Sequence, residues 1–259
     1  MSTRRVALKV AYQGKRFAGS QRQPGKRTVE GRIIADLETI EKTGGDHNLK
    51  AASRTDAGVS ALCNVFVVDT RFGDDATMLR ALNAVSDCVY YVSAVGVPDD
   101  FDPRKAESRS YRYTLPADGL DLGLAQECAA LFVGEHDFSM FCKTDDRDTV
   151  IDMRKVDVGI EGSLMRIDFE ARNYLWHLVR RLVAAIVSVA SGKQPVSKVS
   201  DALAGERVTF GLADPTGLVM TGIEYKGLEF PECPPSYLER LGAEIASLDA
   251  ERSFLTSLR

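Results

Sequence analysis

Hydrophobic positions along the chain follow two periods, two residues in some segments and three to four in others. In the segment 29–40, Ile33, Leu37 and Ile40 recur at the spacing of one helix face. The segment 62–68 is instead a short apolar run, which is typical of a buried strand. In the first part of the chain these patterns predict the strands 6–12, 62–68 and 89–97 and the helices 29–40 and 76–85.

A similar succession of strands and helices follows in the second part. The predicted elements there are the strands 108–115, 150–160 and 164–171 and the helices 122–132 and 174–191. The last helix carries an apolar stripe from Leu175 to Val189, and Arg180 lies off that stripe. Proline and aspartate concentrate at 98–104, which predicts a boundary. We therefore expect an α+β fold in which two similar sheet-plus-helix lobes, residues 1–103 and 104–259, face each other across a basic central cleft.

The net charge of −4 argues against a nucleic-acid partner, but the charges are unevenly distributed along the chain. The first 32 residues carry nine arginines or lysines and one acid, Glu30. A second group of cations surrounds Tyr111 and consists of Arg104, Lys105, Arg109 and Arg112. Cations beside an aromatic ring can hold phosphates while a base stacks, so RNA is a candidate partner. The alternative is a solvated face of long side chains.

Composition limits the other classes of function. The five cysteines are widely spaced and form no C-x-x-C pair, so neither a disulfide framework nor a zinc site is indicated. His136, Asp137 and Cys142 lack a fourth ligand at a recognised spacing, so we expect no metal. No G-K-S/T follows the early glycines Gly14 and Gly19, so neither a phosphate loop nor nucleotide hydrolysis is indicated. The widely spaced cysteines favour a reducing cytoplasm. The longest apolar stretch, 182–190, is too short to span a bilayer, so we expect no membrane contact.

The most informative stretch is the run from Ala52 to Ala61, A-S-R-T-D-A-G-V-S-A. Small residues such as Gly58 leave room for a bulky substrate to approach the backbone. A carboxylate near a guanidinium is ionised at neutral pH, which makes Asp56, two residues after Arg54, a candidate nucleophile. The alternative is a turn in which Asp56 caps a backbone amide and Arg54 is solvated.

This run resembles the signature of TruA-type tRNA pseudouridine synthases. Further segments match in the family's order, namely Tyr12-Gln13-Gly14 with Phe17, Gly19, Gln21 and Gln23, Thr28-Val29-Glu30-Gly31, Arg104-Lys105-Ala106 with Ser108 to Tyr113, His136-Asp137-Phe138 with Phe141, Asn173-Tyr174-Leu175 with Val179-Arg180, and Asp214 to Leu218. Ser20 and Gln13 stand where the family commonly has Trp and Asp. These differences, with Asp214, bear on which RNA is chosen.

The resemblance implies a role for each matched residue. Asp56 would be the nucleophile, Arg180 would pair with it and orient it, and Tyr111 would pack on the flipped base and assist loss of the C5 proton. Arg54 would hold the RNA backbone and Leu218 would form a pocket wall. Gln21 and Arg109 would also contact the substrate. Trp176 and His177 are expected to pack or to lie at the surface, outside the chemistry.

The implied activity is isomerisation of uridine to pseudouridine in tRNA, without a cofactor. The resemblance further implies a homodimer and a target in the anticodon stem-loop, at tRNA positions 38 to 40. Whether Asp56 attacks C1′ or C6 stays open. Two alternatives also stay open: a non-catalytic protein that binds and remodels tRNA, and a hydrolase of a glycosidic bond. A hydrolase would need a second carboxylate, which no spacing in the chain indicates.

Overall fold

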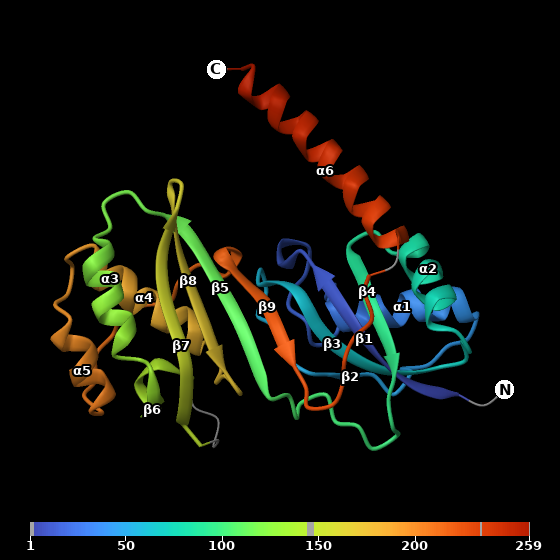
Figure 1. Ribbon diagram of the computed structural model, residues 1–259, viewed down its shortest axis with the longest axis horizontal. Helices are drawn as coiled ribbons and strands as arrows, with labels where there is room; N and C mark the ends of the chain where they lie inside the picture. The colour runs from blue at the N-terminus through green and yellow to red at the C-terminus, as the bar shows by residue number, and fades with distance from the viewer. Residues whose placement is uncertain (1–2, 144–147, 234, 259) are drawn as a thin grey trace.

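The computed structural model describes residues 3–143, 148–233 and 235–258. In these ranges one sheet runs through the molecule in the order β4-β1-β3-β9-β5-β8-β7-β6, with β2 paired to β3 (Figure 1). The strands are β1 Arg4–Tyr12, β2 Lys50–Ala51, β3 Ser60–Thr70, β4 Val89–Gly96, β5 Ser108–Pro116, β6 Gly134–Asp137, β7 Val150–Glu161, β8 Leu164–Ala171 and β9 Leu218–Glu224. The helices are α1 Val29–Glu41, α2 Asp75–Val85, α3 Leu122–Ala130, α4 Leu178–Ala190, α5 Ser197–Leu203 and α6 Pro235–Thr256, with the 3-10 turns η1 Gly14–Arg16, η2 Ser139–Phe141 and η3 Pro215–Gly217. The predicted α+β class is confirmed.

The two predicted lobes share this sheet because β9 joins them. β9 runs parallel to β3, where Ser60 pairs with Val219, and antiparallel to β5, where Tyr111 pairs with Met220. The sequence patterns did not predict β9. The sheet therefore continues past the expected boundary between residues 103 and 104, and the division of the chain into two domains at that point stays a prediction.

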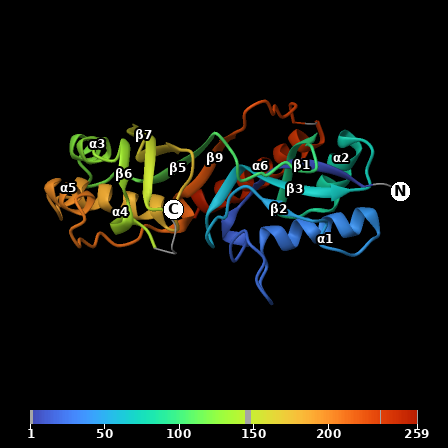
Figure 2. The same cartoon turned by 90° about the horizontal axis from the view of Figure 1, so that it is seen from below.

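The first part of the sheet is covered on both faces. Val6, Leu8 and Val10 of β1 are fully buried. α1 covers the face that is turned away from the viewer in Figure 1, and Figure 2 shows α1 and α4 on the same side of the strands. The chain between β9 and α6 crosses the opposite face, where the Lys9 ammonium lies 5.5 Å from the centre of the Phe230 ring. A strand buried on both faces carries a nearly continuous apolar run, which is why 6–12 lacks strict alternation.

Helix ends follow from local chemistry. The Thr28 side chain accepts a hydrogen bond from Gly31 N and begins α1, and Asp74 caps α2 in the same way. The predicted helix 174–191 is wrong at its start, because α4 begins at Leu178. His177 precedes it in the left-handed conformation, at φ 66°, which an α-helix of L-residues does not continue through. Residues 174–175 are irregular, and residues 176–177 form a turn.

α6 leaves the body beside α2 and β4 and projects away from the sheet (Figure 1). Its first turn is held by Tyr237, whose ring packs edge-to-face on Tyr90 with 6.4 Å between centroids. Further along, Glu244 accepts a hydrogen bond of 3.2 Å from the Gln13 side chain. None of the helices in the described ranges, α6 included, combines the length and the apolar character needed to cross a membrane.

Candidate active site

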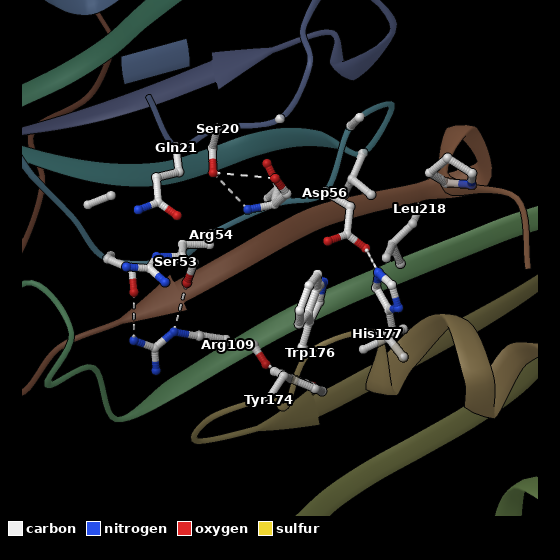
Figure 3. Close-up of a pocket in the computed structure, with 18 of the residues that line it drawn as sticks. Ser20, Gln21, Ser53, Arg54, Asp56, Arg109, Tyr174, Trp176, His177 and Leu218 are labelled. Atoms are coloured by element: carbon white, nitrogen blue, oxygen red, sulfur yellow. Dashed lines mark hydrogen bonds and ion pairs between the residues drawn. The ribbon is translucent and has the colours of Figure 1, made fainter. Parts of the chain in front are cut away.

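A pocket of about 1230 Å³ lies where the two halves of the sheet meet. The first half contributes the loop 51–57 and residues 18–21, and the second half contributes the turn 173–178 and part of β5 (Figure 3). The charged residues in its wall are the cations Lys50, Arg54, Arg104, Arg109 and Arg180 and the acids Glu30 and Asp56. Most of the charge around the pocket is therefore positive, which suits a polyanionic ligand.

Buried polar side chains hold the loop that carries Asp56. Ser20 is fully buried; its hydroxyl accepts from Thr55 N at 2.8 Å, and its own N–H donates to Thr55 O at 3.0 Å. Tyr12 OH and Thr55 Oγ1 share a hydrogen bond of 2.9 Å, and Asn64 Nδ2 donates to Ser53 O at 2.9 Å. These contacts fix the backbone on both sides of Arg54, and they thereby position the carboxylate of Asp56, which follows Thr55. Ser20, one of the departures from the family pattern, thus supports the loop.

Asp56 is paired with an arginine that lies 124 positions later in the chain. Arg180 Nη1 donates to Asp56 Oδ2 at 3.0 Å, while Arg180 Nε donates to Ala213 O at 2.8 Å. The two side chains are 27% and 12% exposed, so the pair is shielded on the arginine side and open on the carboxylate side. Because the arginine holds Oδ2, the other carboxylate oxygen is available to a reactant.

Two glycines allow the segments around Asp56 to approach closely. Gly58 has φ 86°, and a Cβ there would lie 2.9 Å from Pro215 Cγ of η3. At Gly14 a Cβ would lie 2.3 Å from the carbonyl carbon and oxygen of Val59. Backbone atoms cannot move aside as the end of a flexible side chain can. Glycine is therefore required at position 14 by space and at position 58 by conformation and space.

Tyr111 lies deep in the pocket wall and is 7% exposed. The register between β5 and β9 shifts between Ser110 and Tyr111, an irregularity that can redirect a side chain. Its ring packs edge-to-face on Tyr174, with 5.0 Å between centroids. Burial raises the pKa of Tyr111 to about 12, so its phenol is neutral at neutral pH. Leu218, 5% exposed at the start of β9, lines the same pocket.

The remaining residues predicted to contact substrate differ in their surroundings. Arg54 and Gln21 are exposed and line the pocket. Arg109 is 6% exposed, and its guanidinium donates to the Ser53 hydroxyl at 2.9 Å and to main-chain carbonyls of Ala52, Arg104 and Arg172. Arg109 therefore ties β5 to the loop of the first half, and its contact with substrate stays a prediction.

Trp176 and His177 were predicted to pack or to lie at the surface, outside the chemistry, and Trp176 is indeed 44% exposed. Both line the pocket, and His177 Nε2 lies 3.5 Å from Asp56 Oδ2 (Figure 3). Partial burial lowers the pKa of His177 below its ordinary value of 6.5, which leaves the ring neutral at pH 7. One feature of the sequence could have indicated that Trp176 and His177 lie at the pocket: they stand between the matched segments Asn173-Tyr174-Leu175 and Val179-Arg180.

The residues considered as metal ligands make local hydrogen bonds. The His136 ring bonds to Val133 O at 3.1 Å, and Asp137 Oδ1 accepts from Ser139 N at 2.9 Å. Across the part of the chain that the structure describes, no three His, Cys, Asp or Glu side chains are grouped so that they could hold a metal ion.

The chain is similar to known proteins over most of its length. A family profile described as tRNA pseudouridine synthase matches residues 128–226. The tRNA pseudouridine synthase A of Pyrococcus abyssi is 43% identical over 231 residues, which is 88% of this chain and 87% of that protein. The protein of the same name from Thermococcus kodakarensis is 41% identical over 236 residues, 87% of this chain and 86% of its own length. A solved complex of Cbf5, Nop10 and Gar1 aligns with 83% of this chain and 48% of the matched one, at 14% identity and a TM-score of 0.34, a likeness too low to bear on the fold.

Sequence identity of this extent over most of both chains, together with the matching family profile, shows that the proteins share a common ancestor. The chain therefore belongs to the tRNA pseudouridine synthase family. It is an isomerase, an enzyme of the class that converts uridine to pseudouridine.

Proposed function

We propose that the protein isomerises uridine in tRNA with Asp56 as the nucleophile. The observation that carries this proposal is the ion pair of Asp56 with Arg180 inside a cation-lined pocket. A protein that only binds RNA would gain nothing from an open carboxylate, because it repels phosphates. An arginine that holds one carboxylate oxygen and leaves the other open prepares Asp56 for attack.

The reaction exchanges one bond of the base for another. The N1–C1′ bond breaks, the base turns, and a bond forms between C5 and C1′. C5 loses its hydrogen and N1 takes up a proton, so atoms and electrons balance without a cofactor. The target uridine must leave its stack to reach Asp56, and stacking and phosphate contacts in the pocket offset that cost, a few kcal/mol. Attack at C1′ and attack at C6 are both compatible with an ionised Asp56.

Tyr111, Arg54 and Leu218 would receive the flipped nucleotide. The Tyr111 ring and Leu218 offer it apolar surface in the depth of the pocket. Since the phenol of Tyr111 is neutral, with a pKa of about 12, it acts as a hydrogen-bonding group toward the C5 proton or a water and not as a preformed phenolate. Arg54 lines the pocket and is exposed, and it would meet a phosphate of the RNA.

The test is tritium release from a tRNA transcript labelled at uridine C5, with the wild type and Asp56→Asn compared. Asparagine keeps the shape and removes the charge. We expect release by the wild type alone. Equal release by both proteins would remove Asp56 from the mechanism, and no release by either, with tight tRNA binding, would support a binding protein. Mass spectrometry of the RNA separates isomerisation, which conserves mass, from hydrolysis, which frees uracil.

The family resemblance supports a narrower target, uridines at tRNA positions 38 to 40 in the anticodon stem-loop. We propose this region as the site of modification. Mapping of pseudouridine after incubation with a full transcript tests it: modification confined to these positions is expected. Modification only outside the anticodon stem-loop would contradict the proposal without affecting the role of Asp56.

A homodimer is the proposed working form, again on the family resemblance, and the cytoplasm is its proposed location because the cysteines are widely spaced. The projecting α6 adds support, because it exposes apolar side chains at helical spacing, Leu238, Ile245 and Leu248, each about half exposed. Light scattering after size-exclusion chromatography should give twice the chain mass of 28.3 kDa. A monomer at micromolar concentration would contradict the dimer.

A further inference from the structure

The single tryptophan of the chain stands out in the pocket wall. Trp176 is 44% exposed, whereas Leu175 and Leu178 in the same turn are 7% and 0% exposed. The turn thus buries its aliphatic side chains and leaves the largest one partly in contact with solvent, beside Asp56 (Figure 3). An indole left open in a cavity offers a large flat surface to a ligand.

Two side chains lie against this ring, and the main chain of Trp176 is held by a hydrogen bond. Trp176 O accepts a hydrogen bond of 3.0 Å from Lys143 N, and the Lys143 ammonium lies 4.2 Å from the centre of the indole. The His177 ring lies 5.0 Å from the indole, and its Nε2 is 3.5 Å from Asp56 Oδ2. His177 itself has a left-handed backbone, with φ 66°. Trp176 is therefore held at a defined place relative to the nucleophile.

Exposure increases from the depth of the pocket to its mouth. Tyr111 is buried, Asp56 is half-buried and Trp176 is exposed. A flipped base that reaches Asp56 and packs on Tyr111 fills the deeper part. The neighbouring nucleotide of the same strand then passes the mouth, where Trp176 is exposed and the Lys143 ammonium lies over one face of its ring.

We propose that Trp176 is a stacking platform for the unpaired base next to the target uridine. This inference rests on the proposed function, since it takes the ligand to be RNA, and it adds a second base-binding position to the same pocket. Base stacking on an aromatic ring is tolerant of sequence, so the platform recognises an unstacked neighbour and not a particular base. The expected contribution to RNA affinity is about tenfold.

The test uses the fluorescence of Trp176, which no other tryptophan obscures. Asp56→Asn protein, excited at 295 nm, is titrated with a stem-loop RNA that contains the target uridine, and binding is followed in parallel by anisotropy of a label on the RNA. We expect quenching of the emission on binding. An abasic site at one flanking position should abolish the quenching and weaken binding about tenfold, whereas an abasic site at the target should leave the quenching intact. Absence of quenching at saturation, or its loss with the target abasic site alone, would overturn the proposal.

Variants separate stacking from folding. Trp176→Leu should raise the dissociation constant about tenfold, and Trp176→Phe, which keeps an aromatic face, should restore most of the affinity. Equal weakening by both would indicate a structural role for the indole and refute the platform. Quenching by RNA with no tritium release from the wild-type enzyme would leave the stacking site standing and remove the isomerase function, so the two failures are distinguishable.

Discussion

Replacement of Arg180 tests the architecture of the site most directly. Arg180→Met removes the hydrogen bond of 3.0 Å to Asp56 Oδ2 and the bond of 2.8 Å to Ala213 O, while it keeps most of the apolar stem. A hydrogen bond to a charged group contributes about 1.5 to 3 kcal/mol. Because the Asp56 side chain is 27% exposed, water partly replaces the lost partner, and we take about 2 kcal/mol. That free energy corresponds to a decrease of about 30-fold in the rate of the chemical step.

Arg180→Lys separates charge from geometry. A lysine keeps the positive charge, but its single ammonium cannot reproduce two bonds from Nε and Nη1 to partners on either side. We expect it to retain about half of the stabilisation, which is a decrease of about fivefold in rate. The order of rates should therefore be wild type, then lysine, then methionine.

The assay is single-turnover tritium release from C5-labelled RNA with enzyme in excess, so that binding and product release do not limit the rate. Arg181→Met is the matched control, because it removes the same charge from the next position of α4, outside the pocket wall. Its rate should stay within twofold of the wild type. A rate for Arg180→Met within twofold of the wild type, with folding confirmed by urea titration, would refute the assignment of Arg180 as the residue that orients Asp56.

Three further outcomes are expected. Gly14→Ala should lower the free energy of unfolding in urea by about 2 to 3 kcal/mol, because its Cβ meets the Val59 carbonyl at 2.3 Å; Gly73→Ala, with no atom within 4 Å of its Cβ, should be nearly neutral and is the control. In spectrophotometric titration, the difference between the wild type and Tyr111→Phe should show one phenol with a pKa of about 12. Its contribution to stability is then complete below pH 10 and lost as the pH rises toward 12, and loss below pH 10 would contradict the burial. The pKa of His177 lies below 6.5 in the folded state, so below that pH the unfolded chain takes up a proton that the folded chain does not; stability should fall from pH 6.5 downward, and His177→Gln should flatten this part of the profile in urea titrations at pH 7 and 5.

Local patterns predicted most elements because their causes are local. The predicted helix 76–85 corresponds to α2 Asp75–Val85, and the predicted strand 164–171 to β8 Leu164–Ala171. The periods of apolar residues that define such elements lie within a few turns or pairs of neighbouring residues. β9 was missed although Leu218, Met220 and Ile223 are its buried positions, because one residue of irregular spacing interrupts the alternation.

The start of the last predicted helix shows where local patterns mislead. Leu175 continues the apolar stripe of α4 and is buried as expected, yet it lies outside the helix. The left-handed conformation of His177 ends the helical path there, and the contacts of that turn with Lys143 and Asp56 come from segments far away in the sequence. An apolar stripe in the sequence predicts which side chains are buried, but it does not by itself predict that their backbone is helical.

By itself, the sequence determined the α+β class, the order of most strands and helices, and Asp56 as the candidate nucleophile beside Arg54. These depend on residue types and on spacings of a few positions. The tertiary structure decided that β9 joins two halves into one sheet, that Arg109 anchors a loop, that Ser20 supports Asp56, and that Trp176 opens into the pocket. Each of these depends on which strands pair and in which register, and so on the packing of the whole chain, because a shift of one residue in a strand turns every side chain to the other face.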